Sequence, residues 1–298
     1  MGHSLDEHSA SLRGSSESTP QERLLQVVTV LVGNAYADVY VDRLCQMVAR
    51  HLRHPHRFVV FADGVSGRRF NSPGIEVRDC SSWGLPGYFN KLRLFDQAVT
   101  GPEPFLYLDV TLFVRGDLGV FFDHAQSRPA SLVAVHDWNW PVLNSSVCHI
   151  RPDGCTQRVW EYWERGERFG RKFAGDQNYI DAVFRHSNPG ALSHWPAEWV
   201  LSYQNLRKQA ARDEAAAQRL YQRARIIKFH GHPKPPEVLA PWRNLSSTIF
   251  RHPFQPRLWR YLASEIRQHW IVGPADRARG APVNRNARDR IGSEIFKA

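Results

Sequence analysis

Two side chains that could bind a cation follow directly after predicted strands. Asp109 comes after the apolar run 105–108, and His230 comes after the run 226–229. A carboxylate at the end of a buried strand is costly unless it is paired, caps a turn or binds a metal. We therefore expect Asp109 to cap a turn, to meet a buried arginine or to bind a cation, while a single histidine is most commonly a hydrogen-bonded core residue. A carboxylate with an imidazole would suit a divalent cation such as Mn²⁺, provided that the fold brings the two together.

Further polar residues lie where elements begin or in loops. Residues 144–146 (Asn-Ser-Ser) precede a predicted strand, and residues 175–177 (Gly-Asp-Gln) precede a predicted helix. As local structure, the first segment is a turn and the second is an N-cap. Lys91 opens a predicted helix, and Lys234 lies in a proline-rich loop, where a lysine is normally solvated. None of these residues indicates a function by itself. Whether they form a site depends on the helices and strands that position them.

The elements alternate between strands and helices. Mostly apolar runs, the first of them β-branched, predict strands at 26–32, 58–62, 105–108, 132–135, 145–150 and 226–229. Helical spacing of apolar residues predicts helices at 38–52, 91–99, 156–165, 176–186 and 205–223. This alternation predicts an α/β fold, with a mostly parallel central sheet and helices on both faces. In such sheets ligands bind at the carboxyl ends of the strands, where Asp109 and His230 are expected.

Two helices carry specific expectations. Asp38 is predicted to cap the first helix, because the apolar residues that follow it repeat at helical spacing. The segment 205–223 is predicted to form one long helix rich in Ala, Arg and Gln, with little apolar face. Such a helix is either a solvated surface or a surface that faces an acceptor or a membrane.

Composition restricts the class of protein. The chain has 298 residues, 42% of them hydrophobic, which is typical of a globular protein rather than a disordered one. Its formal net charge of +10 favours an anionic partner such as a nucleotide phosphate, a nucleic acid or an acidic membrane surface. The longest apolar stretch, 24–33, is far shorter than the roughly 20 residues that a membrane span needs.

The two ends of the chain differ from its middle. Residues 1–24 and 274–298 lack apolar periodicity and are expected to be flexible tails, the second one basic, around one domain at 25–273. No apolar segment near the N-terminus resembles a signal peptide. The four cysteines form no CxxC pair, so neither a zinc site nor a disulfide framework is indicated. We therefore expect a reduced, cytoplasmic protein, with peripheral contact to the inner face of the membrane left open.

Seven segments, in order, resemble the retaining nucleotide-sugar glycosyltransferases of the GT-A fold, the glycogenin-like and bacterial lipopolysaccharide-galactosyltransferase-like group (family 8-like). The segments span most of the predicted domain and are VGNAYADVYVDRL at 32–44, FNKLRLF at 89–95, FLYLDVTLFVRGDL at 105–118, HDWNWPVLNSSV at 136–147, AGDQNYI at 174–180, PAEWVLSY at 196–203 and IIKFHGHPKP at 226–235. The resemblance implies a single GT-A domain that transfers a hexose from an NDP-sugar, with UDP the expected nucleotide, and retains the anomeric configuration.

The resemblance also implies roles for individual residues. Asp176 and Gln177 would be catalytic and lie beside the anomeric carbon. A Mn²⁺ or Mg²⁺ ion would be held by Asp109, Thr111 and His230. The loop 33–36 would bind the base and ribose, and the diphosphate would be neutralised by metal and lysine. The full set of expected substrate-binding residues is Gly33, Asn34, Tyr36, Lys91, Asp109, Asn144, Ser145, Gly231 and Lys234.

The sequence departs from the family's Asp-x-Asp motif at one position. It reads Asp109-Val110-Thr111, and threonine is a neutral, weak ligand where a carboxylate would hold Mn²⁺. Three alternatives follow. Thr111 coordinates weakly or through water, the enzyme works without metal because lysine and arginine side chains neutralise the diphosphate, or the domain binds a nucleotide or polyanion without turnover.

The partners follow from the same resemblance. They are an NDP-sugar donor and an acceptor that is a glycan, a lipid-linked glycan or a protein. No RNP, helix-turn-helix or zinc motif supports nucleic-acid binding. Three tryptophans predicted in loops near the site, Trp83, Trp138 and Trp140, are candidates for stacking on sugar rings, whereas Trp160 and Trp163 are expected in a helix core.

Overall fold

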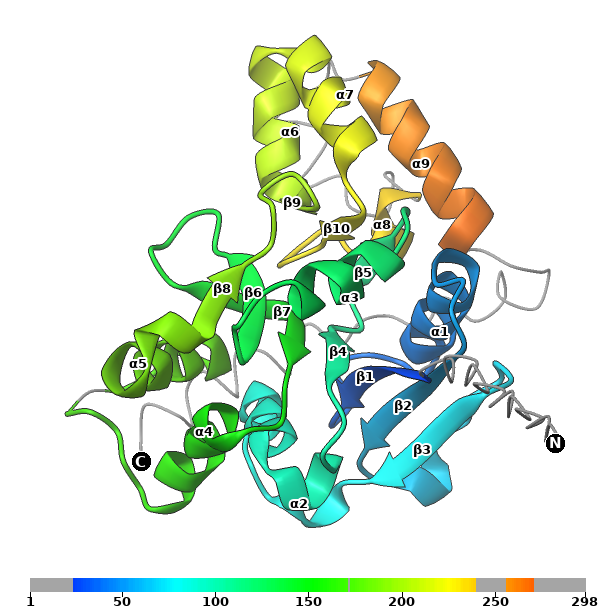
Figure 1. The fold of residues 1–298 in the computed structure, drawn as a ribbon. Coiled ribbons are helices and arrows are strands. Elements are labelled where there is room, and N and C mark those ends of the chain that lie inside the picture. Colours follow the sequence, from blue (N-terminus) through cyan, green and yellow to red (C-terminus); the bar gives the residue numbers. More distant parts are fainter. Residues whose placement is uncertain (1–23, 171, 240–255, 271–298) are drawn as a thin grey trace, which may run out of the picture.

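A computed structural model describes residues 24–170, 172–239 and 256–270, and its centre is a seven-stranded sheet (Figure 1). The strand order is β3-β2-β1-β4-β7-β6-β8. The strands are β1 (Leu25–Leu31), β2 (His56–Ala62), β3 (Ile75–Asp79), β4 (Phe105–Leu108), β6 (Leu132–His136), β7 (Leu143–Ile150) and β8 (Leu192–His194). All of them run in one direction except β7, which pairs antiparallel with both β4 and β6. The expected mostly parallel α/β architecture is therefore confirmed.

Helices cover both faces of this sheet. They are α1 (Val39–His51), α2 (Gln97–Thr100), α3 (Gly119–Gln126), α4 (Gly154–Glu164) and α5 (Asp176–Ser187). Side chains alternate along a strand, so Val27 of β1 joins the core that includes α1 and α3, while Val28 joins the core that includes α4 and α5. Burial on both faces explains why β1 is an almost continuous apolar run.

A second, three-stranded sheet lies beside the first, in the order β5-β10-β9. Its strands are β5 (Leu112–Val114), β9 (Val200–Ser202) and β10 (Ile226–Lys228). In the antiparallel pairing of β5 with β10, Lys228 is opposite Leu112. The short turn 109–111, which joins β4 to β5, therefore lies next to the carboxyl end of β10.

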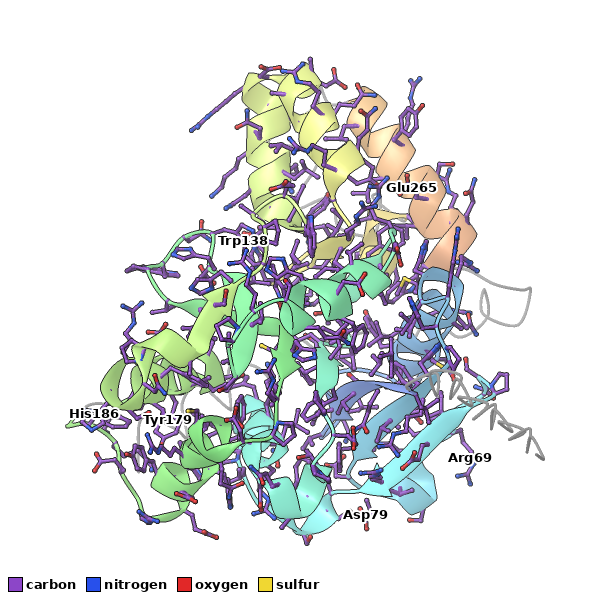
Figure 2. All side chains as sticks on the ribbon, in the orientation of Figure 1. Arg69, Asp79, Trp138, Tyr179, His186 and Glu265 are labelled. Carbon is purple, nitrogen blue, oxygen red and sulfur yellow. The ribbon has the colours of Figure 1, made fainter. Side chains whose placement is uncertain are left out.

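The remaining described helices surround this second sheet. They are α6 (Tyr203–Arg212), α7 (Glu214–Arg223), α8 (Pro235–Val238) and α9 (Pro256–Trp270). Figure 1 shows α6, α7 and α9 together on one side of the molecule. Glu265 of α9, labelled in Figure 2, accepts two hydrogen bonds from Arg115 at 2.9 Å and one from Tyr221 of α7 at 2.7 Å. These bonds fix α9 against the second sheet.

Two helix predictions were wrong in detail. The predicted helix at 91–99 is a 3₁₀ segment (Gly87–Phe95) followed by α2, because the Asp96 side chain accepts the backbone N–H of Ala98 and starts a new helix. The predicted long helix at 205–223 is divided into α6 and α7, because Asp213 caps α7 through the N–H of Ala216 at 2.8 Å. Both helices bury an apolar face against the protein, through Tyr203 and Leu206 in α6 and Ala217 and Tyr221 in α7.

Two other expectations differ from the structure or lie outside it. Asp38 precedes α1, but its side chain makes no cap; its carboxylate instead pairs with Arg68 at 2.9 Å and accepts the backbone N–H of Arg69. Residues 1–23 and 274–298 of the predicted tails, and residues 171, 240–255 and 271–273 of the predicted domain, lie outside the described residues. Within the described ranges, no helix is long and apolar enough to cross a membrane.

Candidate functional site

The site residues gather at the edge of the large sheet where β4 ends. β7 runs opposite to β4, so its first residues, Asn144 and Ser145, lie at this same edge. The backbone N–H of Asp109 donates to the carbonyl of Ser146 at 2.9 Å, which joins the two strands there. Helix α5 begins at this edge with Asp176, whose negative charge is favourable in the first turn of a helix.

Lys91 joins the two acidic side chains of the site. Its ammonium lies 2.8 Å from Oδ2 of Asp176, 3.3 Å from Oδ1 of Asp109 and 2.9 Å from Oγ of Ser145. Ser145 in turn donates to Asp176 at 2.6 Å. Lys91 is only 8% exposed, and burial would lower its pKa, but Asp109 and Asp176 outweigh burial and raise the pKa above the ordinary lysine value. Lys91 is thus a permanent positive charge that holds both carboxylates.

Asp109 is surrounded by hydrogen-bond donors and positive charges. Tyr107 donates its hydroxyl to Oδ1 at 2.7 Å, and the ammonium of Lys228 contacts Oδ2. Burial acts to raise the pKa of Asp109, but Lys228 and Lys91 outweigh it and hold the pKa of this carboxyl well below its usual range. Asp109 is therefore ionised at neutral pH. It meets lysines rather than the buried arginine that was one of the expectations.

Lys228 is a site residue that the sequence analysis did not single out. It is the last residue of β10 and is 8% exposed. Besides Asp109, its ammonium contacts Oγ1 of Thr111 at 3.3 Å. Asp109 and Thr111 are two of the three residues that were expected to hold the metal, and a lysine ammonium lies between them.

His230, the third expected metal ligand, is directed elsewhere. Its Nε2 is 2.8 Å from Oγ of Ser202, and its ring packs edge-on against Trp138 at 5.6 Å between ring centres. No hydrogen bond or ion pair in the described part of the chain joins His230 to Asp109 or Thr111. Burial, with Lys228 nearby, lowers the pKa of His230, so the imidazole is neutral at pH 7.

The residues present do not fit a divalent cation. Metals of the Mn²⁺ and Mg²⁺ type need several oxygen or nitrogen ligands, most of them carboxylates in proteins. Here Thr111 is neutral, His230 contacts Ser202, and the ammonium of Lys228 contacts both Asp109 and Thr111. Among the described residues, no group of three His, Cys, Asp or Glu side chains could hold a metal ion. The expected ligands Asp109, Thr111 and His230 therefore offer one carboxylate, one hydroxyl and one imidazole, and each already has a side-chain partner in the protein.

A second polar network adjoins the first. The Nδ2 atom of Asn144 donates to Oδ2 of Asp137 at 2.9 Å and to Oε1 of Gln177 at 3.2 Å. Oδ1 of Asn144 accepts the hydroxyl of Ser146 at 2.6 Å. Asn144, Ser145, Asp176 and Gln177, all singled out from the sequence, are thus brought together.

The loop after β1 turns sharply at Gly33. Gly33 has φ +68°, in the left-handed region that favours glycine, and its N–H donates to Asp63 at 2.8 Å. Arg68 donates to the Gly33 carbonyl at 2.9 Å, and Asn34 is exposed. Tyr36 lies beneath Lys234, whose ammonium is 5.2 Å from the centre of the tyrosine ring. This loop is rigid at Gly33 and open at Asn34.

Lys234 and Gly231 lie in the turn after β10. Lys234 is 2% exposed and donates to the carbonyl of Phe229 at 3.2 Å. Gly231 has φ +65°, and a Cβ at this position would come within 3.2 Å of the side-chain nitrogen of Gln204. The sharp turn directs Lys234 back toward Tyr36.

The sequence analysis missed four residues of these networks: Tyr107, Asp137, Ser202 and Lys228. Tyr107 and Lys228 are polar side chains within otherwise apolar strands, a pattern that could have found them. Asp137 follows β6 directly, as Asp109 follows β4. Ser202 gives no such signal, because it reads as an ordinary helix cap.

The candidate tryptophans have different environments. Trp138, labelled in Figure 2, donates its indole N–H to the carbonyl of Val200 at 3.2 Å and packs on His230. Trp140 is 68% exposed. Trp83 packs against Phe61 in the core, at 5.0 Å between ring centres, so it is not a loop residue of the site. Trp160 and Trp163 lie on α4 and pack in or against the core, as expected.

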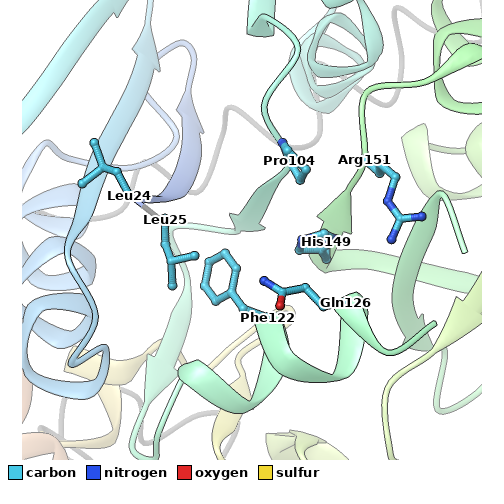
Figure 3. A pocket seen from close by; sticks show the side chains of 7 residues that line it. All are labelled: Leu24, Leu25, Pro104, Phe122, Gln126, His149 and Arg151. Carbon is cyan, nitrogen blue, oxygen red and sulfur yellow. The ribbon is translucent and has the colours of Figure 1, made fainter. Parts of the chain in front are cut away.

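A small pocket lies at the opposite edge of the sheet (Figure 3). It is lined by residues at the beginnings of β1 and β4, at the end of β7 and on α3, including Leu25, Pro104, Arg151 and Phe122. It contains none of the expected site residues, so it is not the site described above.

Solved glycosyltransferase structures have a similar fold. The galactosyltransferase LgtC, in complex with donor and acceptor sugar analogues, matches with a TM-score of 0.54 and 14% sequence identity, over 85% of this chain and 99% of LgtC. An active-site mutant of LgtC matches with a TM-score of 0.56 and 15% identity over the same shares. The bifunctional glycosyltransferase WbbM matches with a TM-score of 0.53 and 13% identity, over 73% of this chain and 48% of WbbM, so this chain spans about half of that protein.

These likenesses confirm the expected GT-A fold. No protein-family model matches the sequence, and no curated protein matches it.

Proposed function

We propose that this protein is a glycosyltransferase that transfers a hexose from a UDP-sugar to an acceptor, with retention of the anomeric configuration. The observation that carries the proposal is the network at the carboxyl edge of the sheet, where Asp176 and Gln177 begin α5 beside Lys91 and Asn144. Its support is the GT-A fold shared with LgtC, a galactosyltransferase that binds donor and acceptor sugar analogues.

The residues of the site have different roles in the proposed reaction, according to their charge. Asp176 and Gln177 present oxygen atoms that stabilise the positive charge that develops on the sugar ring. Lys228 and Lys234 are ammonium groups that stabilise the negative charge that develops on the departing diphosphate. The exposed loop at Asn34 and the ring of Tyr36 receive the nucleoside. Lys91 and Ser145 hold Asp176 in place.

The transfer takes place on one face of the sugar. The bond between the anomeric carbon and the phosphate oxygen breaks, and its electron pair stays with the phosphate. The acceptor hydroxyl oxygen forms the new bond from the same face, and its proton passes to the departing phosphate. The acceptor is a hydroxyl of a glycan, a lipid-linked glycan or a protein.

Hydrolysis of UDP-sugars tests the proposal, because slow transfer to water needs no knowledge of the acceptor. We expect Asp176→Asn to lower kcat by roughly 100-fold, the size of effect seen when one preorganised electrostatic contact is removed. UDP affinity should change little, since Asp176 is assigned to the sugar and not to the nucleotide.

The matched control is Asp123→Asn, the same change at an exposed position on α3. It should leave kcat unchanged. A wild-type protein that binds UDP but hydrolyses no donor, or an Asp176→Asn variant with full activity, would contradict the proposal.

A further inference from the structure

Lys228 has no role in the sequence-based account of the site, yet it contacts two residues of that site. Its ammonium contacts Oδ2 of Asp109 and lies 3.3 Å from Oγ1 of Thr111. The antiparallel pairing of β10 with β5 fixes this position, since it places Lys228 opposite Leu112, next to the turn 109–111. Lys228 is thus held there by sheet hydrogen bonds and not by a flexible loop.

Asp109 does not require Lys228 as a partner. Oδ1 of Asp109 already accepts the Tyr107 hydroxyl at 2.7 Å and lies 3.3 Å from the ammonium of Lys91. A second buried ammonium must be removed from water and repels the first, and these costs are large for buried charges. Structural pairing of Asp109 therefore does not explain why a second lysine is buried beside it.

The hydrogen-bonding capacity of Lys228 differs from that of Lys91. An ammonium group has three N–H donors. Lys91 is engaged by four oxygens from Asp109, Asp176 and Ser145. Among the described residues, Lys228 contacts only Asp109 and Thr111, so one of its donors remains for an oxygen atom of a ligand.

Charge balance gives the third argument. A divalent metal held by two carboxylates forms a group with no net charge. Here threonine at position 111 removes one negative charge, and an ammonium in place of a divalent metal removes one positive charge. Asp109 with Lys228 again has no net charge, so the net charge at this position is the same in either arrangement.

We propose that Lys228 is the built-in cation of this site: its ammonium takes the position of a divalent metal between Asp109 and Thr111 and binds the diphosphate of the donor. The inference rests on the proposed function and assigns to it a donor site that works without metal. In this role the ammonium of Lys228 donates a hydrogen bond to a phosphate oxygen. No metal-bound species takes part.

In the first test the protein is titrated with Mn²⁺ alone, and binding of the ion is measured by electron paramagnetic resonance, which needs no substrate. The wild-type protein should bind no Mn²⁺ at a single specific site at millimolar concentration. The double variant Thr111→Asp, Lys228→His, which supplies a second carboxylate and an imidazole and removes the ammonium, should bind one ion. One Mn²⁺ bound by the wild type and lost in Asp109→Asn would overturn the inference.

UDP binding measured by calorimetry provides the second test. The wild type should bind UDP equally well in excess EDTA and in Mn²⁺. Lys228→Met should weaken binding by about 10- to 100-fold, the value of a hydrogen bond to a charged group. Lys208→Met, the same change at an exposed position on α6, should have no effect.

Two further measurements distinguish a loss of UDP binding from a loss of folding. Lys228→Arg retains a positive donor, so it should keep most of the affinity that Lys228→Met loses, and thermal unfolding shows whether each variant is folded. If EDTA abolishes UDP binding and Mn²⁺ restores it, the result contradicts the role of Lys228 but not the proposed function. If the protein binds UDP without metal but hydrolyses no donor, the result contradicts the proposed function but not the role of Lys228 in binding.

Discussion

Lys91 is the side chain on which the geometry of the two acidic residues depends. It lies 2.8 Å from Asp176 and is buried, while Asp109 has Lys228 as a second partner. Removing Lys91 would therefore leave Asp176 as a buried carboxylate without its cation, and an unpaired buried charge is strongly destabilising.

We expect Lys91→Met to lower the free energy of unfolding by about 3 kcal/mol, measured by urea denaturation. Lys208→Met, the matched change at an exposed lysine, should change it by less than about 0.5 kcal/mol. The double variant Lys91→Met, Asp176→Asn should recover part of the loss, because the stranded charge is removed as well. Equal stability of Lys91→Met and the wild type would show that Asp176 does not depend on this pair.

At the scale of elements, Asp213 determines that the region 203–223 is two helices. It ends α6 and starts α7, and its side chain accepts the N–H of Ala216 at 2.8 Å. Two helices can each turn an apolar face to the protein, which one straight helix with scattered alanines could not do. The region is therefore packed against the second sheet and α9 rather than fully solvated.

Asp213→Ala should lower the free energy of unfolding by about 1 kcal/mol, because the cap of α7 is lost. Asp213→Asn keeps an oxygen acceptor at the same position and should cost only a few tenths of that. Urea denaturation of both variants provides the measurement. Identical losses in the two variants would mean that the charge of Asp213, and not its cap, stabilises the junction.

At the scale of the whole molecule, all four cysteines are free thiols and three of them are buried. Burial, with nearby carboxylates, raises the pKa of Cys45 to about 11 and that of Cys80 to about 12. These thiols therefore stay protonated and unreactive near neutral pH, because the thiolate is the nucleophile.

We expect Ellman's reagent at pH 8 to modify the partly exposed Cys155 and to leave Cys45, Cys80 and Cys148 unmodified in the folded protein. All four should react in concentrated urea. The variant Cys155→Ser should abolish the fast reaction in the folded state. Rapid modification of all four thiols without denaturant would contradict the buried positions described here.

Most of the architecture was predictable from local sequence. The runs that form β1, β2 and β4 are rich in β-branched or aromatic apolar residues, which favours buried strands, and their alternation with helices predicted the sheet. The short strands β3, β5, β8 and β9 and the helices α3, α8 and α9 were not predicted. β3 is partly exposed and β5 has three residues, so neither carries enough periodicity to be recognised alone.

For the site, the sequence by itself placed Asp109 and His230 at the ends of strands, and the family resemblance implied that Asn144 and Asp176 belong to the same site. Only the tertiary structure decided which cation meets Asp109. Lys228 and His230 are two residues apart, and nothing local distinguishes them. The pairing of β10 with β5 fixes Lys228 beside Asp109 and Thr111, whereas His230 lies beyond the end of the strand and turns to Ser202. A contact between residues so distant in sequence depends on strand register, which is set by the packing of the whole fold.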